Sequence, residues 1–166
     1  MTPIVIACVG SPFGADSLGH HVAEILRTHP SVQSLPENLL RIEASDRPQL
    51  NLLTQIEGAQ LAIIVDVVEG EQAPGEIVYI DAEQLAADAG RLTSHSVGVA
   101  EALALGRALN LLPPRLLIIA LSMGKSLHWE PGNEDLAQLA DSVINEVVRL
   151  APALEITPNP TCESRG

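Results

Sequence analysis

The sequence predicts an α/β fold in which a mainly parallel central sheet is flanked by helices on both sides. Short runs of consecutive apolar residues alternate with longer segments whose apolar residues recur at helical spacing. The apolar runs also lack the alternation of a strand that faces water on one side, which is typical of strands covered on both faces. We therefore expect a three-layer sandwich of helices, sheet and helices.

The first half of the chain reads as three strands separated by two helices. We expect the strands at residues 4–9, 39–44 and 61–65. The first helix has apolar residues at helical spacing from Leu18 to Leu26, and Pro30 ends it. The second helix begins at Pro48 and closes at Gly58, because proline suits a first helical turn and glycine suits the residue after the last turn.

The second half continues this alternation. A loop rich in Glu, Gly and Pro leads into the next strand, and Ser94 or Ser96 can cap a helix that ends before Pro113. The remaining expected elements are strands at residues 76–80 and 116–121, a short helical piece near residues 82–89, and a last helix over residues 134–150.

A single domain is expected from the length of 166 residues. We assign residues 1–151 to this α/β domain. From Pro152 onward the chain has three prolines and no helical or strand period. Residues 152–166 are therefore expected to form a flexible C-terminal tail without packed contacts.

Composition narrows the range of partners. The formal net charge of −12 repels nucleic acid and anionic lipid, and an aromatic content of 2% leaves no platform for stacking bases. No apolar run reaches the ~18 residues of a membrane-spanning helix. Cys8 and Cys162 make no disulfide framework. We expect a cytoplasmic protein, a monomer, that binds neither nucleic acid nor membrane.

Three residues carry the candidate chemistry. Asp16 lies in a glycine-rich turn directly before the first helix, Asp66 follows the apolar run of the third strand, and His95 lies near the start of a later helix. A parallel sheet can bring all three to the edge formed by the carboxyl ends of its strands. Because two carboxylates and an imidazole can bind a divalent transition metal, they are the expected metal ligands.

Each of the three also has a purely structural interpretation. Asp16 is placed to cap the first helix, and that role is the more common one for an aspartate at this position. Asp66 is placed to cap a loop through an Asx-turn. A single histidine in a loop, such as His95, is more often a surface residue. Spacing alone does not show that the three converge.

Other motifs give weaker signals or exclude a class. At most one of His20 and His21 can approach the same edge, because neighbouring helical positions point about 100° apart. His128 can line a groove, whereas Trp129 is better interpreted as a loop anchor. The glycines of the first turn match neither a dinucleotide-binding fingerprint nor a P-loop. No Gly-x-Ser-x-Gly elbow is present, and no dedicated nucleophile is identified.

Three segments together resemble the signature blocks of hydrogenase maturation proteases, in order and in approximate spacing. They are residues 10–19 (Gly10-Ser11-Pro12-Phe13-Gly14-Ala15-Asp16-Ser17-Leu18-Gly19), residues 65–70 with Pro74-Gly75, and residues 94–103. The resemblance spans about residues 3–150. It implies a three-layer α/β peptidase domain (phosphorylase/hydrolase-like), in agreement with the elements above.

The resemblance also implies an activity. Proteases of this family remove a C-terminal extension from the large-subunit precursor of a nickel-iron hydrogenase after nickel insertion. Two acids and a histidine form the nickel-recognition site, and these map onto Asp16, Asp66 and His95. The nickel is contributed at least partly by the substrate, and no other cofactor is implied.

The chain departs from the family pattern in three places. The first block is one residue shorter, with Ser11 and Ala15 where the family has an asparagine and an acid. The second strand leads into Glu43 and Asp46 rather than into an aspartate and a glycine-rich turn. The last strand ends in Ala120-Leu121-Ser122-Met123 instead of Gly-Ile-Glu-Pro.

Two other functions remain open at this point. The same ligands would serve a non-catalytic module that binds metal or checks nickel without cutting its partner. A flavodoxin-like domain that binds a nucleotide at the strand edge is the third possibility, although the acidic edge and the missing phosphate loop argue against it.

Overall fold

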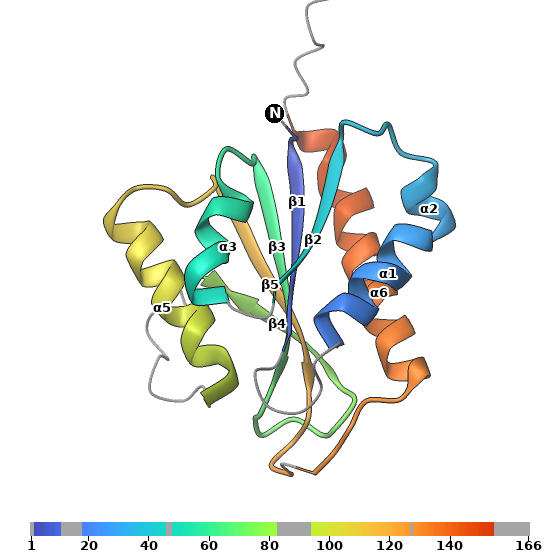
Figure 1. The fold of residues 1–166 in the computed structure, drawn as a ribbon. Coiled ribbons are helices and arrows are strands. Elements are labelled where there is room, and N and C mark those ends of the chain that lie inside the picture. The colour runs from blue at the N-terminus through green and yellow to red at the C-terminus, as the bar shows by residue number, and fades with distance from the viewer. Residues whose placement is uncertain (1, 11–17, 46–47, 83–93, 127, 155–166) are drawn as a thin grey trace, which may run out of the picture.

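A computed structural model describes residues 2–10, 18–45, 48–82, 94–126 and 128–154, with backbone alone at residues 48–50 and 94–97. It has three layers, as the sequence predicted (Figure 1). A five-stranded sheet in the order β2-β1-β3-β5-β4 forms the middle layer. The strands are β1 (Ile4–Val9), β2 (Leu40–Ser45), β3 (Leu61–Val68), β4 (Ile77–Asp81) and β5 (Arg115–Ser122).

Four of the strands run parallel, and β4 pairs antiparallel with β5 at the edge of the sheet. The described helices are α1 (Leu18–Thr28), α2 (Pro30–Gln33), α3 (Pro48–Ile56), α5 (Ser94–Ala108), α6 (Asn133–Leu150) and the 3-10 turn η1 (Ala151–Ala153). In the described ranges, no helix combines the length and the apolar character needed to cross a membrane.

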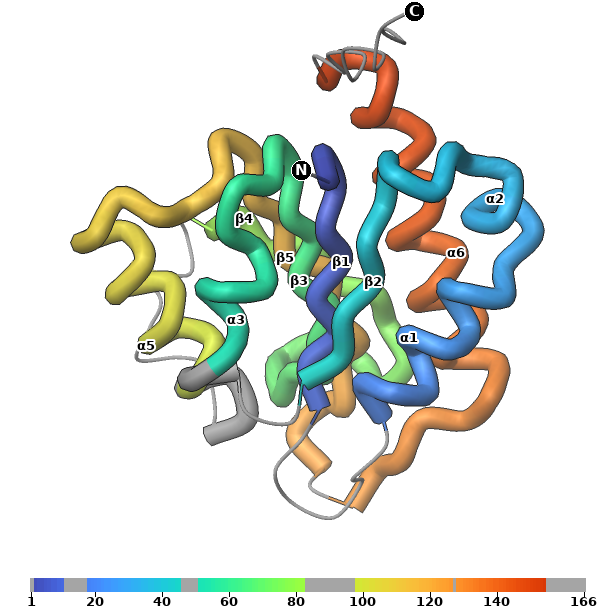
Figure 2. Tube along the Cα trace, turned by 45° about the horizontal axis from the view of Figure 1, so that its top comes forward, coloured from blue at the N-terminus to red at the C-terminus, as the bar shows by residue number. Residues whose placement is uncertain are grey.

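The two faces of the sheet bury different side chains of the same strands. Ile4, Ile6 and Cys8 of β1 pack in a cluster with α1 and α6. Val5, Ala7 and Val9 pack in a second cluster with α3 and α5. Figure 2 shows the same division, with α3 and α5 on one side of the strands and α1 and α6 on the other. Burial on both faces explains why the strands read as continuous apolar runs.

The helices begin and end close to the predicted positions, with one addition. Pro30 ends α1, as predicted, but it also begins α2. Proline suits a first helical turn because its missing N–H needs no partner there. The imidazole Nδ1 of His29 caps this short helix by accepting the N–H of Ser31 at 3.2 Å. Of the helical piece predicted near residues 82–89, only Ala82 lies within the described residues.

The packed structure extends beyond the predicted start of the tail. Leu154 is buried, with 9% of its surface exposed, and belongs to the cluster formed with α1 and α6. The expectation that the chain makes no packed contact after Pro152 is therefore wrong at Leu154. The apolar pattern missed this contact because a single leucine after a proline has no periodicity. Residues 155–166 lie outside the described part of the chain.

Candidate functional site

Asp66 lies inside a central strand. It is the sixth residue of β3, which continues to Val68, so the predicted end of this strand at residue 65 was three residues too early. Strand pairing explains the extension, because β5 pairs with β3 in register as far as Val68 and Ser122. In contrast, β1 pairs with β3 only to Val65. Asp66 therefore lies one residue beyond the last β1 partner, at the carboxyl edge of the sheet.

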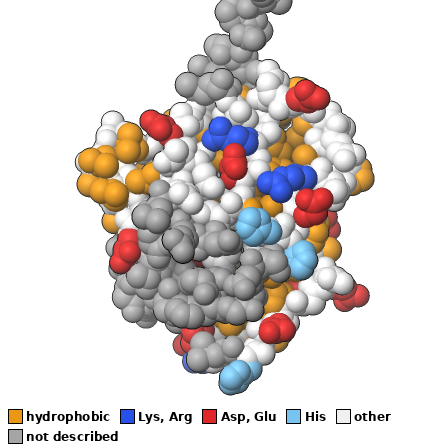
Figure 3. Space-filling view, viewed as in Figure 1, with side chains coloured by type: hydrophobic (Ala, Val, Ile, Leu, Met, Phe, Trp, Pro, Cys, Tyr) orange, Lys and Arg blue, Asp and Glu red, His pale blue; other side chains and the backbone are white. Residues whose placement is uncertain are grey.

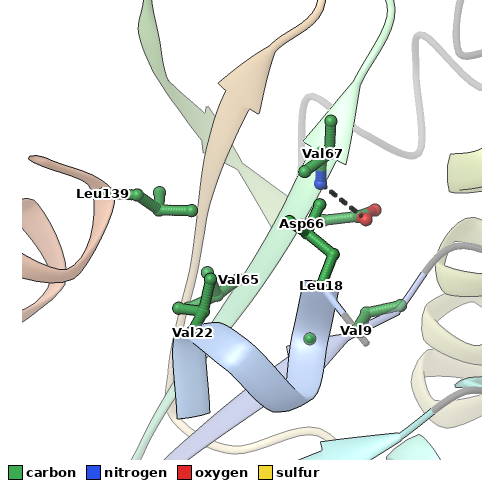
Figure 4. A pocket seen from close by; sticks show the side chains of 8 residues that line it. Val9, Leu18, Val22, Val65, Asp66, Val67 and Leu139 are labelled. Carbon is green, nitrogen blue, oxygen red and sulfur yellow. Dashed lines mark hydrogen bonds between the residues drawn. The ribbon is translucent and has the colours of Figure 1, made fainter. Parts of the chain in front are cut away.

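The side chain of Asp66 lies on the face of the sheet that α3 and α5 cover. Ala62 and Ile64, which precede it at the even positions of β3, both belong to the cluster with those helices. Figure 4 shows the carboxyl group directed away from Leu139 of α6. Only 6% of the residue is exposed.

The environment of Asp66 disfavours its charge. One carboxylate oxygen, Oδ1, accepts the backbone N–H of Val67 at 2.8 Å, and no ion pair joins Asp66 to a described residue. Burial raises the pKa of Asp66 from 3.8 to about 7, and the hydrogen bond from Val67 opposes this rise only in part. A bound cation would stabilise the charged form of such a buried, unpaired carboxyl group.

A small open pocket lies at the same edge of the sheet. It is lined by Val9, Leu18, Gly19, Val22, Val65, Asp66, Val67 and Leu139. Its volume is about 180 Å³, including space open to solvent. Val22, Val65 and Leu139 belong to the cluster formed with α1 and α6, so most of the pocket lies on that face of the sheet. The carboxyl group of Asp66 points away from Leu139 (Figure 4).

The pocket forms because α1 begins directly against the end of β1. A Cβ atom at Gly19 would lie 2.7 Å from the nitrogen of Gly10 and 2.9 Å from the carbonyl carbon of Val9. Only glycine permits so close a contact between the first turn of the helix and the strand backbone. This contact places Leu18 at the pocket.

The other two predicted ligands lie outside what the structure describes in full. Asp16 belongs to residues 11–17, which are not described, and Leu18, two positions later, lines the pocket at this edge of the sheet. The backbone of His95 is the second residue of α5, but its side chain is not described. Figure 1 shows that α1 and α5 both begin at the carboxyl edge of the sheet.

Helical spacing relates position 95 to the sheet. It lies four residues before Val99 and seven before Ala102, and both of these pack on the face that carries Asp66. Among the described residues, no group of three His, Cys, Asp or Glu side chains is arranged to hold a metal. Convergence of Asp16, Asp66 and His95 thus stays a prediction.

The weaker candidates are also placed. His20, His21 and His128 are exposed. Glu43 forms an ion pair with Arg41, with Oε1 and Nε 3.2 Å apart, and Asp46 lies outside the described residues. Trp129 packs against the cluster formed with α1 and α6, which confirms its interpretation as a loop anchor.

Ser122 has a role that the sequence analysis did not assign. It is fully buried at the end of β5. Its hydroxyl group forms hydrogen bonds with Gln72, in the loop before β4, and with Gly124, in the loop after β5. The sequence signal for this role was a serine directly after the unbroken apolar run of residues 116–121.

The fold defines an open α/β domain, a class in which ligands bind at the carboxyl edge of the sheet, where Asp66 lies. The family model described as hydrogenase maturation protease (HycI) matches residues 32–150, a range that includes Asp66 and His95 but not Asp16. The chain belongs to the hydrogenase maturation protease family and is an endopeptidase.

Solved structures show the same fold. The hydrogenase maturating endopeptidase HybD from Escherichia coli is 20% identical, covers 92% of this chain and 94% of its own, and has a TM-score of 0.61. The NiFe hydrogenase maturation protease HybD from Thermococcus kodakarensis is 17% identical, with 91% and 99% covered and a TM-score of 0.57. A solution structure of an E. coli endopeptidase is 20% identical, with 92% and 94% covered and a TM-score of 0.67. Among curated protein sequences nothing matched.

Proposed function

We propose that this endopeptidase removes the C-terminal extension of the large-subunit precursor of a nickel-iron hydrogenase, and that it acts after nickel has been inserted. Asp66 carries the proposal, because it is a buried carboxyl group without an ion-pair partner among the described residues, at the edge of the sheet where ligands bind. The names of the similar structures, which include a NiFe hydrogenase maturation protease, support the substrate class.

Asp66, together with Asp16 and His95, would hold the nickel of the precursor. Carboxylate oxygen and imidazole nitrogen are suitable ligands for this ion, and the ligands of the substrate complete its coordination. When bound, the ion supplies either an anchor for recognition or Lewis-acid assistance at the scissile bond. Burial raises the pKa of Asp66 to about 7, so its role as a ligand requires the carboxyl group to lose its proton.

The decisive experiment compares purified precursor with and without nickel. Intact mass spectrometry should show loss of the C-terminal segment only from the nickel-loaded precursor. Asp16→Asn, Asp66→Asn and His95→Ala should each reduce the cleavage rate steeply. Asp141→Asn is a matched control, because this exposed acid of α6 pairs with His29 and lies away from the pocket.

Two results would contradict the proposal. Equal cleavage of the nickel-loaded and nickel-free precursors would exclude nickel dependence while leaving the endopeptidase activity intact. Normal cleavage by folded Asp66→Asn protein would exclude Asp66 as a nickel ligand.

A further inference from the structure

Two loops beside Asp66 are joined into one unit, which we call the paired loops. The first comprises residues 69–76 between β3 and β4, and the second comprises residues 123–125 after β5. Backbone hydrogen bonds connect them and the adjoining strand ends: Gly70 N–H to Gly124 O (3.1 Å), Gly75 N–H to Ser122 O (2.8 Å), Ser122 N–H to Glu76 O (2.8 Å) and Met123 N–H to Val68 O (2.9 Å).

Ser122 locks this unit through its side chain. Its hydroxyl group donates to the carbonyl oxygen of Gln72 at 2.9 Å and accepts the N–H of Gly124 at 3.0 Å. The residue is fully buried, so loss of the hydroxyl would leave one buried donor and one acceptor without their partner. We call these two hydrogen bonds of the Ser122 hydroxyl group the lock, because together they join both loops.

Two glycines fit the loops tightly together. Gly124 has φ +66°, and a Cβ atom there would lie 2.9 Å from Cδ of Pro74. Gly75 has φ +87°, and its Cβ atom would lie 2.9 Å from Oδ1 of Asp135 in α6. The first contact joins the two loops, and the second supports them against the start of α6.

The position of the paired loops relates them to the reaction. The first loop begins three residues after Asp66, and Val68 and Ser122 are register partners at the ends of β3 and β5. Both loops extend beyond the carboxyl edge of the sheet (Figure 1). Residues 71–74 are exposed, although the backbone that supports them is hydrogen-bonded. A surface ordered in advance saves the entropy that a mobile loop loses on binding.

We propose that Ser122 is a positioning residue that holds the paired loops as a preformed wall beside Asp66, and that the C-terminal segment of the precursor docks against this wall. This inference rests on the proposed function. Ser122 does not take part in the chemistry. It acts through the loops on substrate binding, and its loss should raise KM without a matching loss of kcat.

The first experiment measures precursor cleavage by Ser122→Ala. We expect KM to rise about fivefold, the factor that corresponds to ~1 kcal/mol for one net hydrogen bond, with kcat within about twofold of the wild-type value. Gly124→Ala disturbs the same unit at a second buried position, because alanine is strained at φ +66° and its Cβ atom would meet Pro74, and it should have the same effect. Ser34→Ala is the matched control, because it removes a hydroxyl-to-carbonyl bond of 2.9 Å at a distant, exposed turn.

The second experiment measures the lock itself. Lys125, at the end of the second loop, is the single lysine of the chain, so a lysine-specific protease reports on this loop alone. Cutting should be slow in the wild type and in Ser34→Ala, and faster in Ser122→Ala and Gly124→Ala. Circular dichroism establishes that each variant is folded.

The outcomes separate docking from a purely structural lock. Faster cutting at Lys125 with an unchanged KM would overturn the proposal, as would a fall in kcat at constant KM. If the wild type does not cleave the precursor, the proposed function fails, and the Kd of precursor binding then tests the docking surface directly. A Kd that is equal in wild type and Ser122→Ala, or no binding at all, would overturn it.

Discussion

Two requirements on the single residue Asp66 oppose each other: burial in the sheet and ionisation as a metal ligand. As a carboxyl group in a central strand it loses hydration, which raises its pKa to about 7. As a proposed ligand it has to be deprotonated and accessible to the nickel of the precursor. An acid in an otherwise apolar strand costs stability, and such a cost is typical of functional sites.

Asp66→Asn should increase stability at alkaline pH. The folded pKa lies above the ordinary value of 3.8, so the stabilisation from the protonated group is complete below that value and is lost as pH rises through about 7. Asparagine carries no charge, and its carbonyl oxygen can still accept the N–H of Val67. We expect the free energy of unfolding to exceed that of the wild type by about 2 kcal/mol at pH 8, and by less at pH 5.

Urea denaturation at the two pH values measures this difference. A variant less stable than the wild type at pH 8 would show that the carboxylate of Asp66 supports the fold, as its capping interpretation requires.

The rate of precursor cleavage should also follow the ionisation of Asp66. If the deprotonated carboxyl group binds the nickel of the precursor, kcat/KM should increase as pH rises through about 7 and level off above it. A pH profile from 5 to 9 measures this, and a rate that falls across pH 7 would contradict it.

The start of α1 shows how the site depends on contacts between elements. The helix lies against the backbone of β1 because position 19 has no side chain. Leu18 and Val22 of the helix then line the pocket together with Val9 and Val65 of the strands. A shift of α1 would therefore alter the pocket without changing any of its side chains.

Gly19→Ala should destabilise the protein and widen the pocket. The new Cβ atom would meet backbone atoms at 2.7 and 2.9 Å, which cannot move without displacing the strand or the helix. We expect a loss of about 1–3 kcal/mol in the free energy of unfolding, typical of overpacking.

Gly106→Ala in α5 is the control for Gly19→Ala. Its Cβ atom meets the side-chain ends of Leu53 and Leu112, which can rotate away, and alanine is favoured within a helix. The loss in the free energy of unfolding, measured by urea denaturation, should be smaller for Gly106→Ala than for Gly19→Ala. Equal losses would show that the contact with β1 has no special importance.

At the scale of the whole molecule, two features lie outside the site: the C-terminal end of the domain and an exposed apolar surface near the end of α5. Leu154 packs on the core, so the domain continues beyond the predicted boundary at residue 151. Figure 3 shows exposed apolar side chains over the C-terminal end of α5, where Leu105, Leu109 and Leu111 lie, at the end of the helix opposite to its start at the carboxyl edge.

Two truncations locate the end of the domain. A chain that ends at Ala151 loses the buried side chain of Leu154, whose burial contributes about 1.5–3 kcal/mol, and its melting temperature should fall by several degrees. A chain that ends at Leu154 should keep the melting temperature of the full protein. Equal melting temperatures for the two truncations would show that Leu154 contributes nothing.

The oligomeric state is a separate prediction. The net charge of −12 opposes self-association, so we expect a monomer of 17.6 kDa by light scattering. A larger mass that returns to 17.6 kDa in Leu109→Ser would show that the apolar surface of α5 joins two copies.

The sequence by itself determined the elements of this protein and its class. Residues buried on both faces of a strand have to be apolar at every position, so the strands and the parallel fold could be predicted from local pattern. The same rule drew attention to Asp66, because this acid directly follows such an apolar run. The signature blocks led to the protease family, and the family model agrees.

Only the tertiary structure decided how these parts act together. The extension of β3 past Asp66 depends on pairing with β5, which lies about fifty residues further along the chain. The raised pKa of Asp66, the close contact of Gly19 with β1, the lock at Ser122 and the burial of Leu154 likewise depend on distant partners. Local pattern could not predict them, because burial and hydrogen bonding are set by the residues that folding brings together.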